Sequence, residues 1–365
     1  MANAYIYIYT IALGFIILWQ CAKPAQLSPF NPQRQHTKQN GAFWLMVICI
    51  LFIGFRPVDI EFADMVGYYQ SFKLCIGKEF TYDFDAENFI FDNIMPFIAS
   101  SGYSATVYFT VIATIYFGAM YIACKKLFPN NVLVAYLACL TAFSTFSYAT
   151  NGIKAGAAAS IFLVALAYKD KLWLTIVLAL ISWGFHHSMS MVLVAYVCSR
   201  LFKGTKWYFW GWLAALIIAI LHITFFQTLF AEYTDEQGAG YLIANARKSA
   251  YITGFRPDFV IYSVAPIVIG FYMIYIRRIK DDGYELWLRM YILTNAVWML
   301  CMYASYGNRI AYLSWFLYPI VLIYPYLKIL WHKRQFAFAK RAVVYQYLFT
   351  LFMEAIYYTI LKQPS

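Results

Sequence analysis

Long apolar runs, separated by little polar sequence, constrain this chain more than any other feature. Two of them are LWLTIVLALISWGF at 172–185 and GWLAALIIAILHITFF at 211–226. Of the 365 residues, 63% are hydrophobic and only 12% are charged, with a mean hydropathy of +0.60, whereas a soluble domain carries about a quarter charged residues. Too little polar sequence remains to cover these runs in water. We therefore predict an all-α, polytopic integral membrane protein with about 11–12 transmembrane helices.

The candidate spans follow from the length of helix that crosses a bilayer, about 20 apolar residues. The run that starts at Ala4 has no basic leader, so we interpret it as a span and not as a cleavable signal peptide. The runs on either side of His186 and His187 are short, which indicates either two tilted helices or a pair that meets at a polar break. The predicted spans are 4–20, 41–55, 103–123, 131–149, 153–168, 172–185, 187–199, 207–226, 259–276, 287–305, 310–327 and 343–360.

The charged residues between these spans sort into two alternating sets. Basic residues of short loops stay on the cytoplasmic side, so the first set predicts the inner face and the acid-rich set the outer face. Two long extracytoplasmic loops then result, 56–102 and 227–258, within a single transmembrane domain, 1–365. The inner set is Lys23, Arg34, Lys38, Lys125, Lys126, Lys169, Lys171, Arg200, Lys203, Lys206, Arg277, Arg278, Lys280, Lys328, Lys333, Arg334, Lys340 and Arg341. The outer acids are Asp59, Glu61, Asp64, Glu79, Asp83, Asp85, Glu87, Asp92, Glu232, Asp235, Glu236 and Asp258.

Several classes of function are excluded by what the sequence does not contain. The net charge of +11 lies between spans and forms no patch for nucleic acid, and the seven cysteines show neither a CxxC pair nor zinc spacing. We expect no metal, no cofactor and no disulfide framework. Glycine-rich phosphate loops, nucleophile elbows and HExxH are absent from the sequence. The inner loops are too short for a nucleotide-sugar domain, so a glycosyl donor would have to be lipid-linked and presented from outside.

The outward cations lie at the ends of apolar spans. GFRP occurs twice, with Arg56 and Arg256, while Arg309 ends the short sequence YGNR. Lys154 follows Asn151-Gly152 and precedes the small-residue run AGAAAS. A lysine in the first turn of a helix suits an anion, because free backbone N–H groups point the same way. The alternatives are that the arginines reach toward lipid headgroups and that Lys154 pairs with Asp64 or Asp258.

Candidates for proton transfer lie on the same predicted face. His186 and His187 interrupt an apolar run, and histidine exchanges a proton near neutral pH, which suits a base or a leaving group. If the stretch after Arg56 is helical, Asp64 shares a face with Tyr68. Asp64 can then act on a sugar hydroxyl or form an ion pair with Arg56. Outer tyrosines can stack on sugar rings or simply pack against spans, namely Tyr68, Tyr69, Tyr233, Tyr241 and Tyr251.

At these residues the chain resembles the EpsG-like, Wzy-type bacterial polysaccharide polymerases, over nearly its whole length. GFRP at 54–57 with Asp64 and Tyr68 resembles the early G-x-R and D-x-x-x-Y segment of that family. NGIKAGAAASIFLVAL is similar to its helix start, FHHS to its H-x-S element, and GFRPDFVIYSVAPI to its R-x-D-F segment. NRIAYLSWFLYP, with Asn308 and Arg309, resembles its last arginine-bearing span. The family more often has Arg-Gln where this chain has Lys154-Ala155.

The resemblance implies a GT-C-like multispanning glycosyltransferase architecture and a polysaccharide polymerase. Its substrates would be undecaprenyl-diphosphate-linked oligosaccharide repeats in the lipid bilayer at the outer face of the bacterial inner membrane. A flippase and a chain-length regulator of the same pathway would be its partners. Arg56, Lys154, Arg256 and Arg309 would hold the diphosphate, and Asn151, Tyr68 and Asn308 would contact substrate. The base would be His186, with Asp64, His187 or Asp258 as alternatives.

Three other functions are compatible with the same charges. A flippase or transporter of the lipid-linked glycan would distribute charges through the bilayer midplane, whereas the predicted spans carry almost none there apart from Glu354. An O-antigen ligase would share the donor but transfer the glycan to lipid A core. A membrane acyltransferase would need a route for a cytoplasmic acyl donor.

Overall fold

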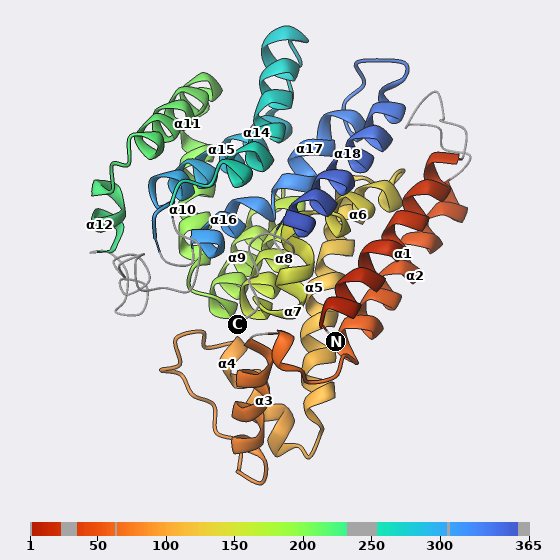
Figure 1. Cartoon of the computed structure of the whole chain (residues 1–365), viewed down its shortest axis with the longest axis vertical. Coiled ribbons are helices and arrows are strands. Elements are labelled where there is room, and N and C mark those ends of the chain that lie inside the picture. The colour runs from red at the N-terminus through yellow and green to blue at the C-terminus, as the bar shows by residue number, and fades with distance from the viewer. Residues whose placement is uncertain (1, 23–34, 63, 232–253, 305–306, 357–365) are drawn as a thin grey trace. The chain divides into compact units, whose positions relative to one another are not determined.

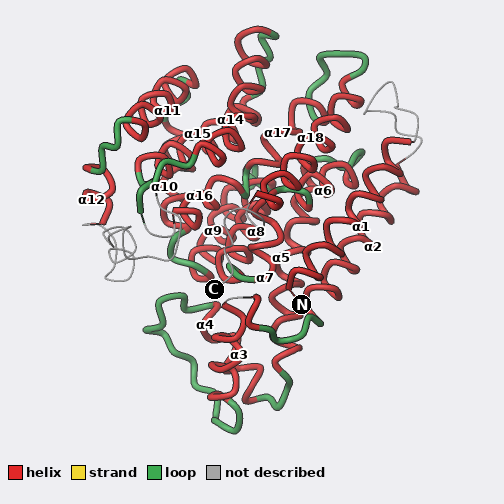
Figure 2. The backbone as a smooth tube through the Cα atoms, viewed as in Figure 1, coloured by secondary structure: helices red, strands yellow, loops and turns green. Residues whose placement is uncertain are grey.

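A computed structural model describes residues 2–22, 35–62, 64–231, 254–304 and 307–356. Within these ranges the chain is built from helices and loops without strands (Figure 2), which confirms the all-α prediction. Contacts divide the chain into two compact units, the first comprising Met1–Ser190 and Tyr326–Tyr347 and the second Met191–Pro325 and Leu348–Ser365. The unit boundaries fall inside α10 (Met189–Leu201), α17 (Tyr318–Leu327) and α18 (Gln335–Ile356).

The first unit contains the helices of the N-terminal half and two helices of the first long loop (Figure 1). Its elements are α1 (Ala2–Ala22), α2 (Gln35–Gly54), η2 (Ile60–Phe62), α3 (Asp64–Cys75), α4 (Phe91–Ser100), α5 (Ala105–Leu127), α6 (Val132–Leu140), α7 (Phe143–Thr150), α8 (Ile153–Ala167) and α9 (Leu172–Phe185). α3 starts at Asp64, so the condition under which Asp64 and Tyr68 share a helix face is met.

Small residues bring the central helices of this unit together. A Cβ on Gly156 of α8 would stand 2.7 Å from the carbonyl oxygen of Tyr148 in α7, so only glycine permits this approach. The alanines that follow Gly156 are 0–1% exposed, and Ser182 Oγ of α9 donates to the carbonyl oxygen of Ala158 at 2.7 Å. The AGAAAS run therefore serves close packing of α8 against α7 and α9.

The second unit packs around buried aromatic side chains. Its elements are α11 (Thr205–Ile220), α12 (Phe225–Ala231), α14 (Pro257–Phe271), the π-helix η4 (Tyr272–Ile276), α15 (Asp282–Leu300) and α16 (Gly307–Trp315). Trp287, Trp298 and Trp315 are each at most 1% exposed. Buried polar groups connect the helices: Trp212 Nε1 donates to Asn295 Oδ1 at 2.8 Å, and Asn295 Nδ2 donates to Ser314 Oγ at 3.0 Å. Such bonds hold helices together where no water competes.

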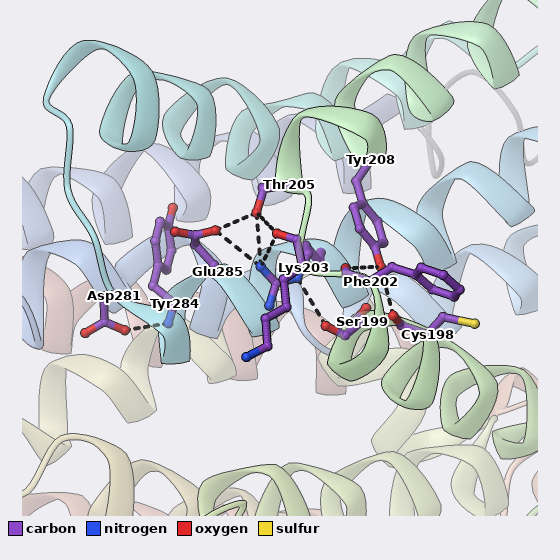
Figure 3. Close-up of polar contacts among 10 residues, drawn as sticks. Cys198, Ser199, Phe202, Lys203, Thr205, Tyr208, Asp281, Tyr284 and Glu285 are labelled. Atoms are coloured by element: carbon purple, nitrogen blue, oxygen red, sulfur yellow. Dashed lines mark hydrogen bonds and ion pairs between the residues drawn. The ribbon is translucent and has the colours of Figure 1, made fainter.

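A polar clasp closes the last turn of α10 in the second unit (Figure 3). Tyr208 donates to the carbonyl oxygens of Cys198 and Phe202 at 3.1 and 2.9 Å. Arg289, which is 4% exposed, donates to those of Ser199 and Lys203 at 3.2 and 3.3 Å. Thr205 and Glu285 complete the clasp, since Thr205 Oγ1 donates to Glu285 Oε2 at 2.6 Å and Arg289 Nη1 lies 3.2 Å from the same oxygen. Carbonyls that a helix end leaves open are thus satisfied.

Helices lie at most of the positions predicted for spans, but fewer than the predicted 11–12 are long and apolar enough to cross a membrane. Among the described residues there are four such helices, or up to five if one bent pair counts as a single span: Ala4–Ala22, Ala105–Leu127, Pro257–Ile276 and Gly307–Leu327. The span predicted at 131–149 is wrong as a single helix, because α6 and α7 meet at 72°. Where α6 ends, Thr141 Oγ1 donates to the carbonyl oxygens of Leu137 and Ala138 at 2.8 and 3.2 Å. Around His186, the pair of short helices that meets at a break is confirmed, since α9 ends at Phe185 and α10 begins at Met189.

Candidate functional site

Lys154 lies in the first turn of α8 and pairs with an acid of the first long loop. Its Nζ donates to Asp92 Oδ1 at 2.7 Å, and the two side chains are 27% and 30% exposed. The alternative in which Lys154 pairs with an acid is therefore met, but the named acids, Asp64 and Asp258, were wrong. The carboxylate on the ammonium group belongs to Asp92, at the start of α4.

Asn88 connects this ion pair to the histidine break. Its backbone N and Nδ2 both donate to Asp92 Oδ2, at 3.1 and 3.4 Å, while its Oδ1 accepts from the backbone N of His187 at 3.1 Å. The side chain is only 3% exposed. One buried amide therefore holds Asp92 and the backbone of His187 at the same time.

Residues 88–93, here called the docked segment, lie against the end of α9. The backbone N of Ile90 donates to the carbonyl oxygen of Gly184 at 2.9 Å. The ring centroids of Phe89 and Trp183 are 5.9 Å apart and the ring planes meet at 64°, an edge-to-face contact. A Cβ on Gly184 would stand 2.7 Å from Ile90 and 2.8 Å from Phe89. The absence of a side chain at Gly184 lets the loop approach this closely.

Phe91 is the centre of an aromatic cluster under the ion pair. It is 1% exposed, and its ring centroid lies 6.1 Å from that of Tyr68, 6.3 Å from that of Tyr108 and 6.1 Å from that of Phe185. The Lys154 ammonium sits 5.4 Å from the centre of the same ring, within cation–π range. Tyr68, predicted to contact substrate, thus shares a neighbour with Lys154.

His186 has an extended backbone, with φ −158° and ψ 120°. Its Nδ1 accepts a hydrogen bond from the backbone N of Ser188 at 3.1 Å. An acceptor at Nδ1 places the proton of the neutral ring on Nε2. In that tautomer Nε2 is a donor and not a base. The ring of His187 instead lies against that of Trp183, with 4.8 Å between the ring centroids and a tilt of 40° between the ring planes.

Arg56 is 4% exposed and caps helix ends. Nη1 donates to the carbonyl oxygen of Ile53 at 2.7 Å and Nη2 to that of Thr150 at 3.1 Å. Burial lowers the pKa of the guanidinium to about 10, so the group stays charged at neutral pH. Nε has no hydrogen-bond partner among the described residues. The first GFRP therefore ties the ends of α2 and α7 together.

The second GFRP has a different geometry, in the second unit. Arg256 grips Asp258 with two bonds, Nε to Oδ1 at 2.9 Å and Nη2 to Oδ2 at 2.5 Å. The guanidinium also lies 3.8 Å above the ring of Phe259. Asp258 occupies the first turn of α14, where a carboxylate is stabilised by the helix dipole. Both oxygens of this candidate base are thus engaged by a cation.

The remaining predicted residues fall at the starts and ends of helices. Asn308 and Arg309 are exposed in the first turn of α16, in the second unit. Asn151 follows the end of α7, and its buried Oδ1 has no hydrogen-bond partner among the described residues. The structure brings Asp64, Tyr68, Lys154, His186 and His187 into the first unit, with Arg56 and Asn151. Tyr233, Tyr241, Tyr251 and most of the second long loop lie outside the described residues.

Asn88 and Asp92 are the residues that sequence reasoning did not single out. The sequence pattern marked Asp92 only as one of many acids on the outer face, and it did not mark Asn88. The signal available was the short sequence NFIFDN, in which three consecutive apolar residues stand between polar residues within an otherwise acidic loop. That pattern indicates a half-buried segment, although it does not identify the partner.

The helical fold and the apolar spans define a polytopic membrane protein. The chain belongs to the EpsG family, whose sequence model matches residues 42–363. It is accordingly a membrane protein of polysaccharide biosynthesis. No curated protein and no solved structure matches the chain.

Proposed function

We propose that this protein is a polysaccharide polymerase that joins undecaprenyl-diphosphate-linked oligosaccharide repeats on the outer face of the bacterial inner membrane. The observation that carries the proposal is Lys154, a partly exposed ammonium group at the N-terminus of a buried helix. Both the cation and the N–H groups of that first turn favour an anion. Membership of the EpsG family supports a glycan substrate.

In this proposal Lys154 holds the diphosphate, while the same role for Arg256 and Arg309, in the second unit, stays a prediction from the sequence. A cation there stabilises the negative charge that develops as the sugar leaves its diphosphate. Arg56 supports the site indirectly, because both of its terminal nitrogens are bound to carbonyl oxygens of α2 and α7. Its role is to fix the helix ends from which Asn151 and Lys154 follow.

The reaction breaks the bond between the anomeric carbon and the diphosphate oxygen, and forms a bond from that carbon to an acceptor hydroxyl. His186 fits the departing oxygen as a donor through Nε2, given the hydrogen bond that Nδ1 accepts. The hydroxyl proton needs a base. Asp64 is our first candidate, because it belongs to the same unit as Lys154 whereas Asp258 is held at both oxygens by Arg256.

The direct test supplies purified lipid-linked repeat to the purified full chain and separates the products by length. A ladder of longer glycans is expected from the wild type, and Lys154→Ala should abolish it. The matched control is Lys73→Ala, an exposed lysine of the first unit whose ammonium group lies over the ring of Tyr69. Unchanged ladders from Lys154→Ala would remove this residue from the mechanism.

The same preparation separates the other functions. Transfer to lipid A core without a ladder identifies a ligase, and movement of intact repeat across a vesicle membrane identifies a flippase. Acylated repeat identifies an acyltransferase. Stimulation or length control by a flippase and a chain-length regulator can be examined only after a ladder is seen.

A further inference from the structure

We propose that Asp92 is the resident counter-ion of Lys154 and that the substrate's diphosphate competes with it for the ammonium group. This inference rests on the proposed function for the chemical class of the ligand. It assigns to the diphosphate site a residue, Asp92, that lies 62 positions away from Lys154 in the sequence.

The Lys154–Asp92 pair has the properties of a contact that can be exchanged. A single hydrogen bond of 2.7 Å joins the two groups, and the two side chains are 27% and 30% exposed to solvent. The other acid–base pair at a predicted site residue, Arg256–Asp258, has two bonds and exposures of only 15% and 20%. Lysine acts as a point charge without the fixed geometry of arginine. An entering anion can therefore replace the carboxylate on Lys154 more easily than the carboxylate on Arg256.

Asp92 also remains satisfied when Lys154 turns away. Oδ2 keeps its bonds from the backbone N and Nδ2 of Asn88, and the backbone N of Asp92 is bound to the carbonyl oxygen of Asn88 at 2.9 Å. Breaking an ion pair is usually costly because it leaves a buried charge without a partner. The exchange avoids this cost, since Asp92 keeps its bonds from Asn88. The Phe91 ring, 5.4 Å from Nζ, keeps the ammonium near its place.

Two residues near this pair, one through its packing and one in the sequence, carry a buried polar atom without a hydrogen-bond partner among the described residues. Tyr108 is 0% exposed, packs its ring against Phe91, and its hydroxyl has no hydrogen-bond partner among the described residues. The buried Oδ1 of Asn151, three residues before Lys154 in the sequence, also has no hydrogen-bond partner among the described residues. Groups of this kind are usually satisfied by water or ligand, which indicates that the surroundings of Lys154 have unused capacity for hydrogen bonds.

The test measures binding of inorganic pyrophosphate to the full chain in detergent by calorimetry, without divalent metal. Asp92→Asn keeps the shape and removes the charge, so pyrophosphate should bind about fivefold more tightly, as expected for an ion pair near the surface. Asp85→Asn is the control, since it removes the same charge from an exposed position of the same loop. It should change the affinity less than twofold. Lys154→Ala should weaken binding, and in that background Asp92→Asn should have a smaller effect than in the wild type.

Each result has a defined meaning. Weaker or unchanged binding in Asp92→Asn overturns the inference, as does an equal effect in both Lys154 backgrounds, which would indicate only a long-range charge effect. Absence of saturable pyrophosphate binding to the wild type also overturns it. Melting curves of every variant check the fold. If binding behaves as expected and no glycan ladder forms, the polymerase proposal fails while the counter-ion assignment stands.

Discussion

Gly184 and Ile90 approach each other so closely that the glycine has no room for a side chain. A Cβ on Gly184 would stand 2.7 Å from the Ile90 side chain, a separation that real Cβ atoms do not show, and the Ile90 backbone N is fixed to the Gly184 carbonyl oxygen at 2.9 Å. The contact joins a loop residue to the end of α9. It sets how the docked segment, and with it Asp92, lies against the histidine break.

Gly184→Ala should move the docked segment. Overpacking of this kind destabilises by about 1–3 kcal/mol, and we expect a lower melting temperature together with a shorter glycan ladder. Gly211→Ala is the matched control, because a Cβ on Gly211, in α11, meets nothing within 4 Å. It should be neutral or slightly stabilising. Equal melting temperatures for the two variants would show that the segment is not fixed at Gly184.

Asn88→Ala should loosen both groups that the amide holds. The Asp92 carboxylate loses one donor and the backbone N of His187 loses its acceptor, so a loss of about 1–3 kcal/mol in the free energy of unfolding is expected. Hydrogen exchange at 186–188 should accelerate. Gln70→Ala, which truncates an exposed amide in α3, should leave both measurements unchanged. Exchange at 186–188 that matches the wild type would contradict the role of Asn88.

Exchanging the two charges, Asp92→Lys with Lys154→Asp, separates structure from binding. The double variant should melt above either single reversal, because the ion pair is re-formed in the opposite sense. It should nevertheless bind pyrophosphate poorly, since the first turn of α8 then carries an acid. Tight binding by the double variant would mean that the position of the cation does not matter.

Arg56 should matter for stability even if it never touches substrate. Arg56→Ala removes charge-assisted bonds to the carbonyl oxygens of Ile53 and Thr150. Each of these two bonds contributes at most about 1.5–3 kcal/mol to the free energy of unfolding, and this contribution should be lost. Arg56→Lys keeps the charge but cannot reach both oxygens with a fork, so it should fall between Ala and the wild type. Melting curves in detergent measure this. A wild-type melting temperature in Arg56→Ala would contradict the capping role.

His186 should tolerate glutamine better than asparagine. If the essential group is the donor at Nε2, Gln presents an amide N–H at about that distance, whereas Asn reproduces only the Nδ1 end of the ring. We expect His186→Ala and His186→Asn to lower the initial rate by about a hundredfold or more, with His186→Gln in between. A rate order in which Asn exceeds Gln would place the working atom at Nδ1.

The helices were largely predictable because long apolar runs dominate the chain. The span predicted at 172–185 coincides with α9. The span predicted at 153–168 coincides with α8 except for its last residue, because α8 ends at Ala167. The bend between α6 and α7 was not predictable, since neither glycine nor proline marks it and the apolar run continues through Thr141. There a side-chain hydroxyl bound to preceding carbonyl oxygens accompanies the end of the helix.

The site was only partly predictable, because its decisive contacts join residues far apart in the sequence. Lys154 was identified by its place before a small-residue run. Its partner Asp92 could not be, since several outer acids had the same local signature. The two GFRP copies illustrate the same limit. Arg56 is buried against backbone carbonyls and Arg256 grips a carboxylate two residues ahead, although their local sequences begin alike.

The first long loop is anchored by α3, which ends at Cys75, and by the docked segment at 88–93. Between these two anchors lie several exposed residues. Ile76, Gly77, Lys78 and Glu79 and the positions from Asp83 to Asp85 are all exposed. An epitope tag or a cysteine for impermeant labelling inserted at Lys78 should leave the anchored parts in place. Whether such a label reacts in intact cells would reveal directly which side of the bilayer Lys154 serves.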